Sequence, residues 1–405
     1  MEKLDDIYPK TESAEYLFDA FEKRLGPPEK YYDDGNESSS NNLVLQLGTN
    51  DPSRLQTCVE HTIQRYNNIK EINLNCGCPA IESGGASTYG ASLMKDAELT
   101  GKLVESVRKG LEGSGRADLP DPGISVKCRI AVFENDSDMR PLVEDDYNYL
   151  KEYISTIHDA GANHVILHAR PAILSGLSPV KNRIVPKLDY EFVEKIASEF
   201  KGKVDITLNG GITSLSQLQS LQENSNSNGG SSAISSYMAG RWCLRRPLDL
   251  IGVEALLKRE KLDSTTSSSL SLIQNAIEQY VDDAVKTGSL ASPKYEPTLA
   301  ELCLPLFLIV EQLKDDYEYD EDEDEIGMKF DSIERPSLTY DEIESLYDVL
   351  RDGVAQIDGL SKSGRKKKKE NNSNNGINFK RLSSSFKSLV GTKVANKWKR
   401  NRAEL

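Results

Sequence analysis

Short apolar runs alternate, from residue 43 onward, with segments whose apolar residues recur at helical spacing. The runs are nearly continuous, which is typical of parallel strands covered on both faces. The expected strands are Leu43–Gly48, Glu71–Asn75, Ile124–Ile130, His164–Arg170, Val204–Ile212 and Ile234–Arg241. The segments that predict helices are Pro52–Asn67, Ser92–Leu111, Asp145–Ala160 and Asp189–Phe200. This alternation predicts an α/β fold.

Polar or glycine residues stand at the end of nearly every expected strand. They are Gln46, Asn75, Lys127 with Arg129, His168 with Arg170, Asn209, and Gly240 with Arg241. Residues for chemistry at the carboxyl ends of many strands are characteristic of a (β/α)8 TIM barrel, whereas an open doubly wound sheet gathers its ligand contacts at one switch point. The pattern therefore favours a TIM barrel, of which six strands are visible.

The remaining segments divide the chain into three predicted parts. Residues 1–42 contain a helical stretch at Glu12–Arg24 and a polar loop but no apolar strand, so we expect a barrel that is incomplete at its N-terminus. Residues 43–257 form the barrel, and residues 258–405 form a helical domain.

Within residues 258–405 the apolar spacing predicts helices at Leu270–Val285 and Thr339–Val354. Residues 315–325 are almost entirely acidic, and residues 364–376 are basic and then rich in asparagine. Such compositions cannot form a packed core, so we interpret both segments as linkers.

Charge is distributed unevenly along the chain. The net charge is −14. Residues 364–405 contain thirteen Lys or Arg and two Glu, a local charge of +11 that leaves −25 for the other 363 residues. A basic tail on an acidic body favours a polyanionic partner, although a solvated tail has the same composition.

The last 28 residues predict an amphipathic helix. Its apolar stripe includes Phe379, Phe386 and Trp398, and we expect this stripe to pack against neighbouring helices. The basic residues around the stripe are then available to bind phosphates. Those we assign to RNA contact are Lys397, Lys399 and Arg400.

Composition argues against several classes of protein. A chain with only four histidines is improbable as a zinc enzyme, and no metal site is expected. The apolar runs are too short for a membrane span. The acidic start is no secretory signal, and six cysteines without a C-x-x-C pair indicate a reducing compartment. We expect the protein to be a monomer and to lie in the cytoplasm or an organelle.

Two glycine sites follow consecutive strands and suggest a phosphate-bearing cofactor. Gly210-Gly211 follows Asn209, and Gly240 precedes Arg241. Barrels often hold a phosphate on the loops after their last two strands, where a side chain would block the approach.

Lys127 and His168 stand in otherwise apolar strands, where a polar side chain is costly unless it has a partner. A salt bridge or a satisfied core histidine would explain them. Together with Gln46 they also fit the polar edge of a flavin.

Cys78 lies on the loop after the second visible strand, between Gly77 and Pro79. An exposed thiol there can act as an acid near neutral pH. Cys76 is a local competitor, and we prefer Cys78 because it follows the strand end.

The stretch Leu74-Asn75-Cys76-Gly77-Cys78-Pro79, followed by Gly90-Ala91-Ser92-Leu93-Met94, resembles the tRNA-dihydrouridine synthases over about residues 43–250. The segments His168-Ala169-Arg170, Gly176-Leu177-Ser178-Pro179 and Asn182-Arg183 resemble the A-type branch of that family. The family usually opens with a first strand and a flavin-covering loop that have no counterpart here, and Val180 stands where the branch tends to carry lysine.

The resemblance implies an FMN enzyme that uses NADPH to reduce uridine 20 or 20a in the D-loop of tRNA to dihydrouridine. Cys78 would protonate carbon-5 of the uracil after hydride transfer to carbon-6. The implied FMN contacts are Gln46, Lys127, His168, Asn209, Gly210, Gly211, Gly240 and Arg241. Asn75 and Arg183 would contact the tRNA, and Arg129 would line the pocket.

Two alternatives stay open. Another FMN barrel acting on a small molecule would share the phosphate site but would have no use for a basic C-terminal helix. A tRNA-binding homologue with impaired catalysis would keep the helix and lose the flavin.

Overall fold

The structure is a computed structural model in which the placement of part of the chain is described. The described residues are 2–4, 14–28, 43–66, 69–80, 88–115, 123–227, 232–253, 266–289, 302–306, 308–309, 312, 345–346, 348–350 and 352–357. They form two compact units, Met1–Ile212 with Leu221–Ala239, and Thr213–Ser220 with Gly240–Leu405. The domain boundaries predicted after residues 42 and 257 stay predictions.

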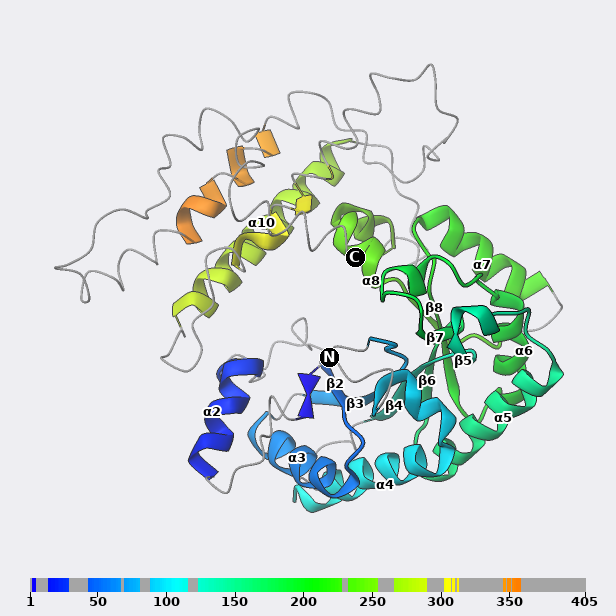
Figure 1. The fold of residues 1–405 in the computed structure, drawn as a ribbon. Helices are drawn as coiled ribbons and strands as arrows, with labels where there is room; N and C mark the ends of the chain where they lie inside the picture. The colour runs from blue at the N-terminus through cyan, green and yellow to red at the C-terminus, as the bar shows by residue number, and fades with distance from the viewer. Residues whose placement is uncertain are drawn as a thin grey trace. The chain divides into compact units, whose positions relative to one another are not determined.

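A seven-stranded parallel sheet, in which spatial order follows chain order, organises the first unit (Figure 1). Its strands are β1 (Glu2–Lys3), β2 (Leu43–Gly48), β3 (Ile69–Cys76), β4 (Gly123–Arg129), β6 (His164–His168), β8 (Asp205–Asn209) and β9 (Ser236–Met238). Consecutive parallel strands with intervening helices are the arrangement of a β/α barrel, so the α/β prediction is confirmed. Among the described residues no pairing joins β1 to β9, and the sheet has an edge at each.

The structure adds a strand before Leu43, within residues where the sequence shows no apolar strand. Glu2 and Lys3 pair in parallel with Leu47 and Gly48 of β2. This strand consists of two charged residues, so it shows none of the apolar pattern by which strands are recognised in a sequence.

Helices follow one another along the outer side of the sheet (Figure 1). They are α3 (Pro52–Arg65), α4 (Ala97–Gly113), α5 (Glu144–Asp159) and α6 (Tyr190–Phe200), after an earlier helix α2 (Ala14–Leu25). The side chains of Asp51, Asp96 and Asp189 accept hydrogen bonds from the first turns of α3, α4 and α6. These aspartate caps satisfy backbone donors and fix where each helix begins.

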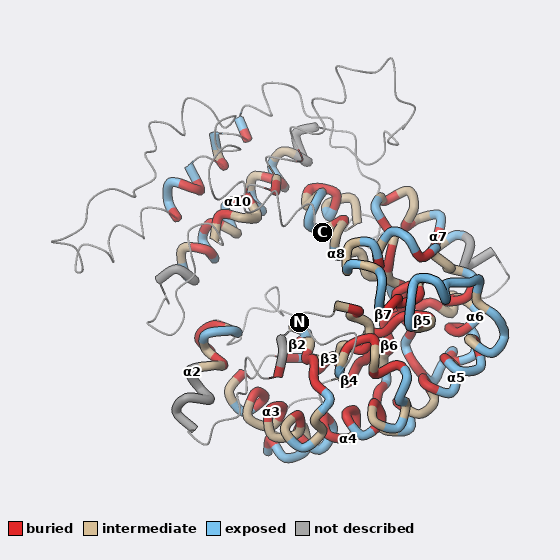
Figure 2. Tube along the Cα trace, in the orientation of Figure 1, coloured by how far each residue is buried: buried red, intermediate tan, exposed pale blue. Residues whose placement is uncertain are grey.

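The strands alternate between an apolar and a polar face. Ile72, Leu74 and Cys76 of β3 are buried, and the Cys76 thiol contacts Tyr153 of α5, so this face lies against the helices. The strands of this sheet are largely red in Figure 2, which marks their residues as buried. The intervening residues of β3, among them Asn73 and Asn75, therefore face the other side, where the site lies.

A second, two-stranded parallel sheet stands beyond the ends of β4 and β6. It pairs β5 (Val132–Asn135) with β7 (Ala172–Ser175), and sequence analysis did not predict it. Val132, Ala172 and Leu174 pack against Ala91 of the 3-10 helix η3 (Gly90–Lys95). These loops therefore form an ordered layer next to the strand ends.

The second unit is helical where it is described. Helix α8 (Gly240–Arg245) and the 3-10 helix η6 (Pro247–Asp249) precede helix α10 (Thr266–Ser289), which contains the predicted helix Leu270–Val285. Ile273, Ile277, Val281 and Ala284 of α10 join one core with residues between 303 and 357. The described residues within Thr339–Val354 are helical as predicted. No described helix is long and apolar enough to cross a membrane.

The core of the second unit encloses a hydrogen-bonded carboxylate. Asp249 accepts hydrogen bonds from Trp242 Nε1 at 2.8 Å, Arg246 Nε at 2.7 Å and Gln312 Nε2 at 2.9 Å. Since a buried charge is tolerated only with such partners, this cluster joins α8 and η6 to Gln312.

Candidate active site

The loop after β3 is held by its own strand end. Asn75 Oδ1 accepts hydrogen bonds from the backbone N–H groups of Gly77 at 3.1 Å and Cys78 at 3.0 Å. The carbonyl oxygen of Cys78 accepts from the backbone of Ala91 at 2.8 Å. The backbone of Cys78 is thus fixed on both sides, and its side chain is half-buried.

Cys76, the competing thiol, occupies a different environment. It is fully buried on the helix-facing side of β3, and burial raises its pKa to about 12. Because a thiol with that pKa gives up its proton reluctantly, the geometry supports Cys78 as the reactive cysteine.

Gln46 on β2 bridges the two asparagines of β3. Gln46 Oε1 accepts from Asn75 Nδ2 at 3.1 Å, and Gln46 Nε2 donates to Asn73 Oδ1 at 2.6 Å. Each bond uses only part of the amide's capacity, because the oxygen has a second lone pair and the nitrogen a second hydrogen. The amide is therefore oriented and can still bind a ligand.

Lys127 lies on β4 as the register partner of Asn75. It is half-buried, and desolvation together with the neighbouring Arg129 lowers its pKa to about 8. Lys127 is also close enough to Cys78 for the two side chains to interact electrostatically. Among the described residues, no hydrogen-bond acceptor or carboxylate partners its ammonium group. The salt bridge that could have explained this lysine is absent from that part of the chain.

Arg129, on the same face of β4 as Lys127, forms hydrogen bonds with three loops. Its side chain is 4% exposed and donates to the carbonyl oxygens of Gly77 at 3.1 Å, Pro171 at 3.2 Å and Asn182 at 3.2 Å. These bonds connect the Cys78 loop to the loops after β6 and β7. Its predicted place in the pocket wall stays a prediction.

His168 is buried at the end of β6 against the glycines that follow β8. A Cβ on Gly210 would lie 2.4 Å from His168 Cδ2, and one on Gly211 would lie 2.3 Å from Leu188 Cδ1. Both glycines have positive φ, 107° and 74°. Asn209 Nδ2 donates to the carbonyl oxygen of Met238 at 2.7 Å. The glycines are therefore required by the packing of His168 and Leu188, whether or not a phosphate binds there.

The other predicted site residues are placed as follows. Gly240 and Arg241 open α8 in the second unit, and a Cβ added to Gly240 would meet nothing within 4 Å. Arg183 ends the 3-10 helix η5 (Lys181–Arg183) and is half-buried. Its neighbour Asn182, fully buried, bonds both the N–H and the carbonyl of Ile173. Lys397, Lys399 and Arg400 lie outside the described residues.

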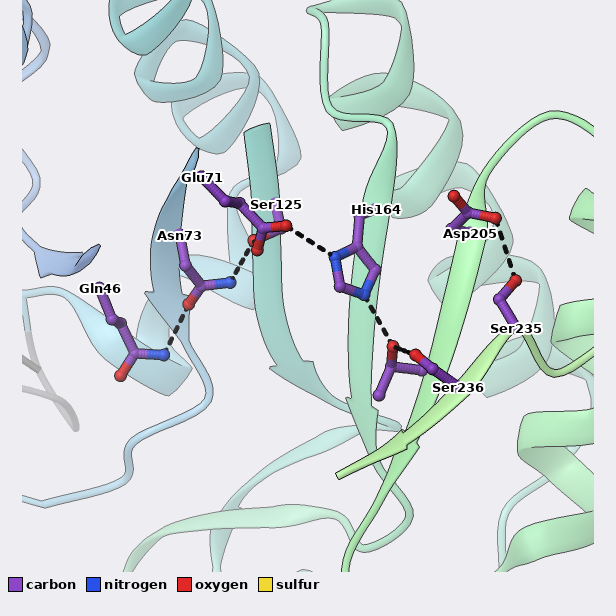
Figure 3. Close-up of polar contacts among 9 residues, drawn as sticks. Gln46, Glu71, Asn73, Ser125, His164, Asp205, Ser235 and Ser236 are labelled. Atoms are coloured by element: carbon purple, nitrogen blue, oxygen red, sulfur yellow. Dashed lines mark hydrogen bonds and ion pairs between the residues drawn. The ribbon is translucent and has the colours of Figure 1, made fainter. Parts of the chain in front are cut away.

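Sequence analysis missed a row of polar side chains that crosses the sheet below these strand ends (Figure 3). Asn73 Nδ2 donates to Ser125 Oγ at 2.6 Å, and Ser125 donates to Glu71. Glu71 Oε2 lies 3.2 Å from His164 Nδ1, and His164 Nε2 lies 2.7 Å from Thr207 Oγ1, which contacts Ser236. The signal was present, because Glu71, Asn73 and Asn75 alternate with apolar residues at the strand period.

These donors fit a flat, polar, anionic cofactor. An amide on β2, an ammonium on β4 and an imidazole on β6 offer several hydrogen bonds and a positive charge at the carboxyl ends of successive parallel strands. No group of three or more His, Cys, Asp or Glu residues arranged to hold a metal occurs among the described residues.

A parallel β/α sheet of barrel order, with its polar site at the strand ends, defines the class as the TIM-barrel type. The family model for dihydrouridine synthase matches residues 26–290, more than half of the chain. The chain therefore belongs to the dihydrouridine synthase family, whose members are TIM barrels.

Several similar proteins carry the name tRNA-dihydrouridine(20/20a) synthase. The one from Shewanella oneidensis is 33% identical over 217 residues, 53% of this chain and 55% of that protein. The one from Pasteurella multocida is 36% identical over 183 residues, which are 45% of this chain and 49% of that protein. The one from Escherichia coli K12 is 30% identical over 251 residues, which are 61% of this chain and 62% of that protein. The chain thus spans about half to three fifths of the length of these relatives.

Proposed function

We propose that this chain is a flavin-dependent tRNA-dihydrouridine synthase that reduces a D-loop uridine to 5,6-dihydrouridine. The observation that carries the proposal is the cluster of Gln46, Asn75 and Cys78 next to Lys127, in a chain of this family. A cofactor-facing amide and ammonium beside a fixed thiol are the groups that this reaction needs.

The FMN contacts that we propose come from the expected strand ends and glycine turns of the chain. They are Gln46, Lys127, His168, Asn209, Gly210, Gly211, Gly240 and Arg241. FMN, reduced by NADPH, would supply the hydride for carbon-6 of the uracil. Lys127, protonated in most molecules at pH 7 because its pKa is about 8, would stabilise negative charge on the cofactor.

Cys78 is the proposed proton donor to carbon-5 of the uracil. Asn75 and Ala91 hold its backbone, which keeps the loop that carries the thiol in place. The target base must leave the tRNA stack to reach this depth.

The proposed tRNA contacts are Asn75, Arg129 and Arg183 near the strand ends and Lys397, Lys399 and Arg400 in the tail. Lysine and arginine side chains neutralise phosphates, which gives affinity without sequence preference. The names of the relatives specify positions 20 and 20a, and we propose the same positions for this chain.

Flavin retention tests this function. The full chain is incubated with FMN and desalted, and the visible absorbance of the protein fraction is recorded. We expect retained flavin, and a loss of about tenfold or more in FMN affinity for Lys127→Met, because a charged hydrogen bond is lost. Exposed Lys102→Met is the matched control.

The two alternatives predict different results in the same experiment. Protein that binds tRNA but stays colourless would indicate a tRNA-binding homologue. Protein that retains FMN without affinity for tRNA would indicate an oxidoreductase acting on a small molecule.

A further inference from the structure

Buried and half-buried polar side chains form a continuous row across four strands. Gln46, Asn73, Ser125 and His164 are successive register partners on β2, β3, β4 and β6. Asn73 and Ser125 are 1% and 0% exposed, and Glu71 lies between Ser125 and His164 (Figure 3). Burying such groups stabilises a fold less than burying apolar groups of the same shape, so the row calls for an explanation beyond packing.

The direction of the hydrogen bonds is fixed at the end nearest Cys78. Backbone N–H groups can only donate, so Asn75 must present its oxygen to Gly77 and Cys78. Its nitrogen then donates to Gln46 Oε1. Gln46 Nε2 is consequently the donor to Asn73 Oδ1, and Asn73 Nδ2 the donor to Ser125.

Glu71, at the other end of this path, requires the same direction of hydrogen bonding. An ionised carboxylate can only accept, and burial alone would raise the pKa of Glu71. The hydrogen bonds from His164 and Ser125 outweigh burial and hold that pKa below its ordinary value, so Glu71 stays ionised. Ser125 must therefore donate to Glu71 and accept from Asn73. Because both ends require one direction, the row has a single satisfied arrangement.

We propose that Glu71 and Asn73 are positioning residues, which orient the amide of Gln46 and, through Asn75, the loop that carries Cys78. The inference rests on the proposed function, since Gln46 and Cys78 are its cofactor-facing amide and its acid. Glu71 is the anchor: it accepts from Ser125, Ser125 accepts from Asn73, and Asn73 in turn accepts directly from Gln46.

The opposite half of the row supplies a control. Thr207, 3% exposed, bonds His164 Nε2, on the side of Glu71 away from Gln46. A carboxylate accepts from both sides independently, so losing the Thr207 hydroxyl leaves the bonds toward Gln46 in place. Thr207→Val and Asn73→Leu each remove a buried hydrogen-bonding group, and only Asn73→Leu lies between the anchor and Cys78.

Alkylation of Cys78 in the full chain, without flavin, tests the proposal. Rates of iodoacetamide labelling are followed by mass spectrometry, with half-buried Cys243 as the internal reference. We expect Asn73→Leu to raise the Cys78 rate about fivefold, because a lost hydrogen bond favours opening of the loop, and to leave Cys243 unchanged. Thr207→Val should change neither rate. If Asn73→Leu does not fold, Ser125→Ala cuts the same path with a smaller change in volume.

A conservative pair separates positioning from packing. Glu71→Gln keeps an oxygen that accepts from Ser125, whereas Glu71→Leu removes it, so only Glu71→Leu should raise the Cys78 rate. An equal rise in Thr207→Val and Asn73→Leu, or no rise in Asn73→Leu and Ser125→Ala, would overturn the proposal. FMN affinity, measured afterwards, should fall about fivefold in Asn73→Leu and stay constant in Thr207→Val. Wild-type protein that binds no FMN would contradict the proposed function while leaving the thiol result interpretable.

Discussion

Asn75 Oδ1 lies 3.0 Å from the backbone nitrogen of Cys78 and accepts its hydrogen bond. The same amide donates to Gln46, so the residue that fixes the thiol loop also orients the group expected to face the cofactor. A single side chain thus connects the proposed acid to the proposed flavin site.

Replacing Cys78 tests whether binding and proton donation are separate. Cys78→Ala removes the thiol but leaves the backbone bonds to Asn75 and Ala91, so we expect FMN binding to be retained and dihydrouridine formation to be lost. Cys243→Ala serves as the control, since that thiol is also half-buried. Unchanged dihydrouridine formation in Cys78→Ala would remove Cys78 from the proposed chemistry.

The lowered pKa of Lys127 predicts a dependence of stability on pH. Between about 8, its pKa in the fold, and its ordinary 10.5, the unfolded chain binds more protons at this residue than the folded chain. The free energy of unfolding contributed by Lys127 therefore rises with pH across that window, and below pH 8 the full cost of the buried charge is present.

Urea unfolding at several pH values measures this contribution. The stability of the wild type relative to Lys127→Met should rise from pH 8 to pH 10.5. The same comparison with exposed Lys102→Met should stay flat. A flat difference for Lys127→Met would mean that the ammonium is not desolvated.

Gly210 should tolerate no side chain. Gly210→Ala combines φ of 107° with a Cβ 2.4 Å from His168, so we expect a loss of about 2 kcal/mol or more in unfolding free energy. Gly202→Ala is the matched control, because Gly202 has φ of 78° and open space, and should lose about 1 kcal/mol. Equal losses in thermal or urea unfolding would show that His168 moves aside freely.

The basic tail should contribute to tRNA affinity through phosphates. Replacing Lys397, Lys399 and Arg400 with serine should weaken binding and reduce the slope of log affinity against log salt by about two. Replacing Lys366, Lys367 and Lys368 of the linker removes the same charge and should have a smaller effect. Equal effects would indicate a solvated tail that acts through net charge alone.

The sequence predicted six parallel strands and several site residues because both depend on local patterns. Functional residues of a β/α fold lie at the ends of its strands. In the structure, four of the predicted residues lie close together: Gln46, Asn75, Lys127 and Cys78. Strands β1, β5 and β7 were missed because they are short and are defined by backbone pairing.

The polar row was missed for a different reason. The strands were treated as nearly continuous apolar runs, although β3 alternates Glu71, Asn73 and Asn75 with apolar residues. Whether such residues form hydrogen bonds with one another depends on the register between strands, which brings Asn73 opposite Gln46 and Ser125. No single segment of the sequence encodes that register.

Dihydrouridine content of tRNA after incubation with the full chain, FMN and NADPH is the most direct test of the proposed activity. An unmodified tRNA transcript is digested to nucleosides, and dihydrouridine is quantified by mass spectrometry. We predict dihydrouridine only when protein, FMN and NADPH are all present, at position 20 or 20a. Protein that binds both FMN and the transcript yet forms no dihydrouridine would contradict the account.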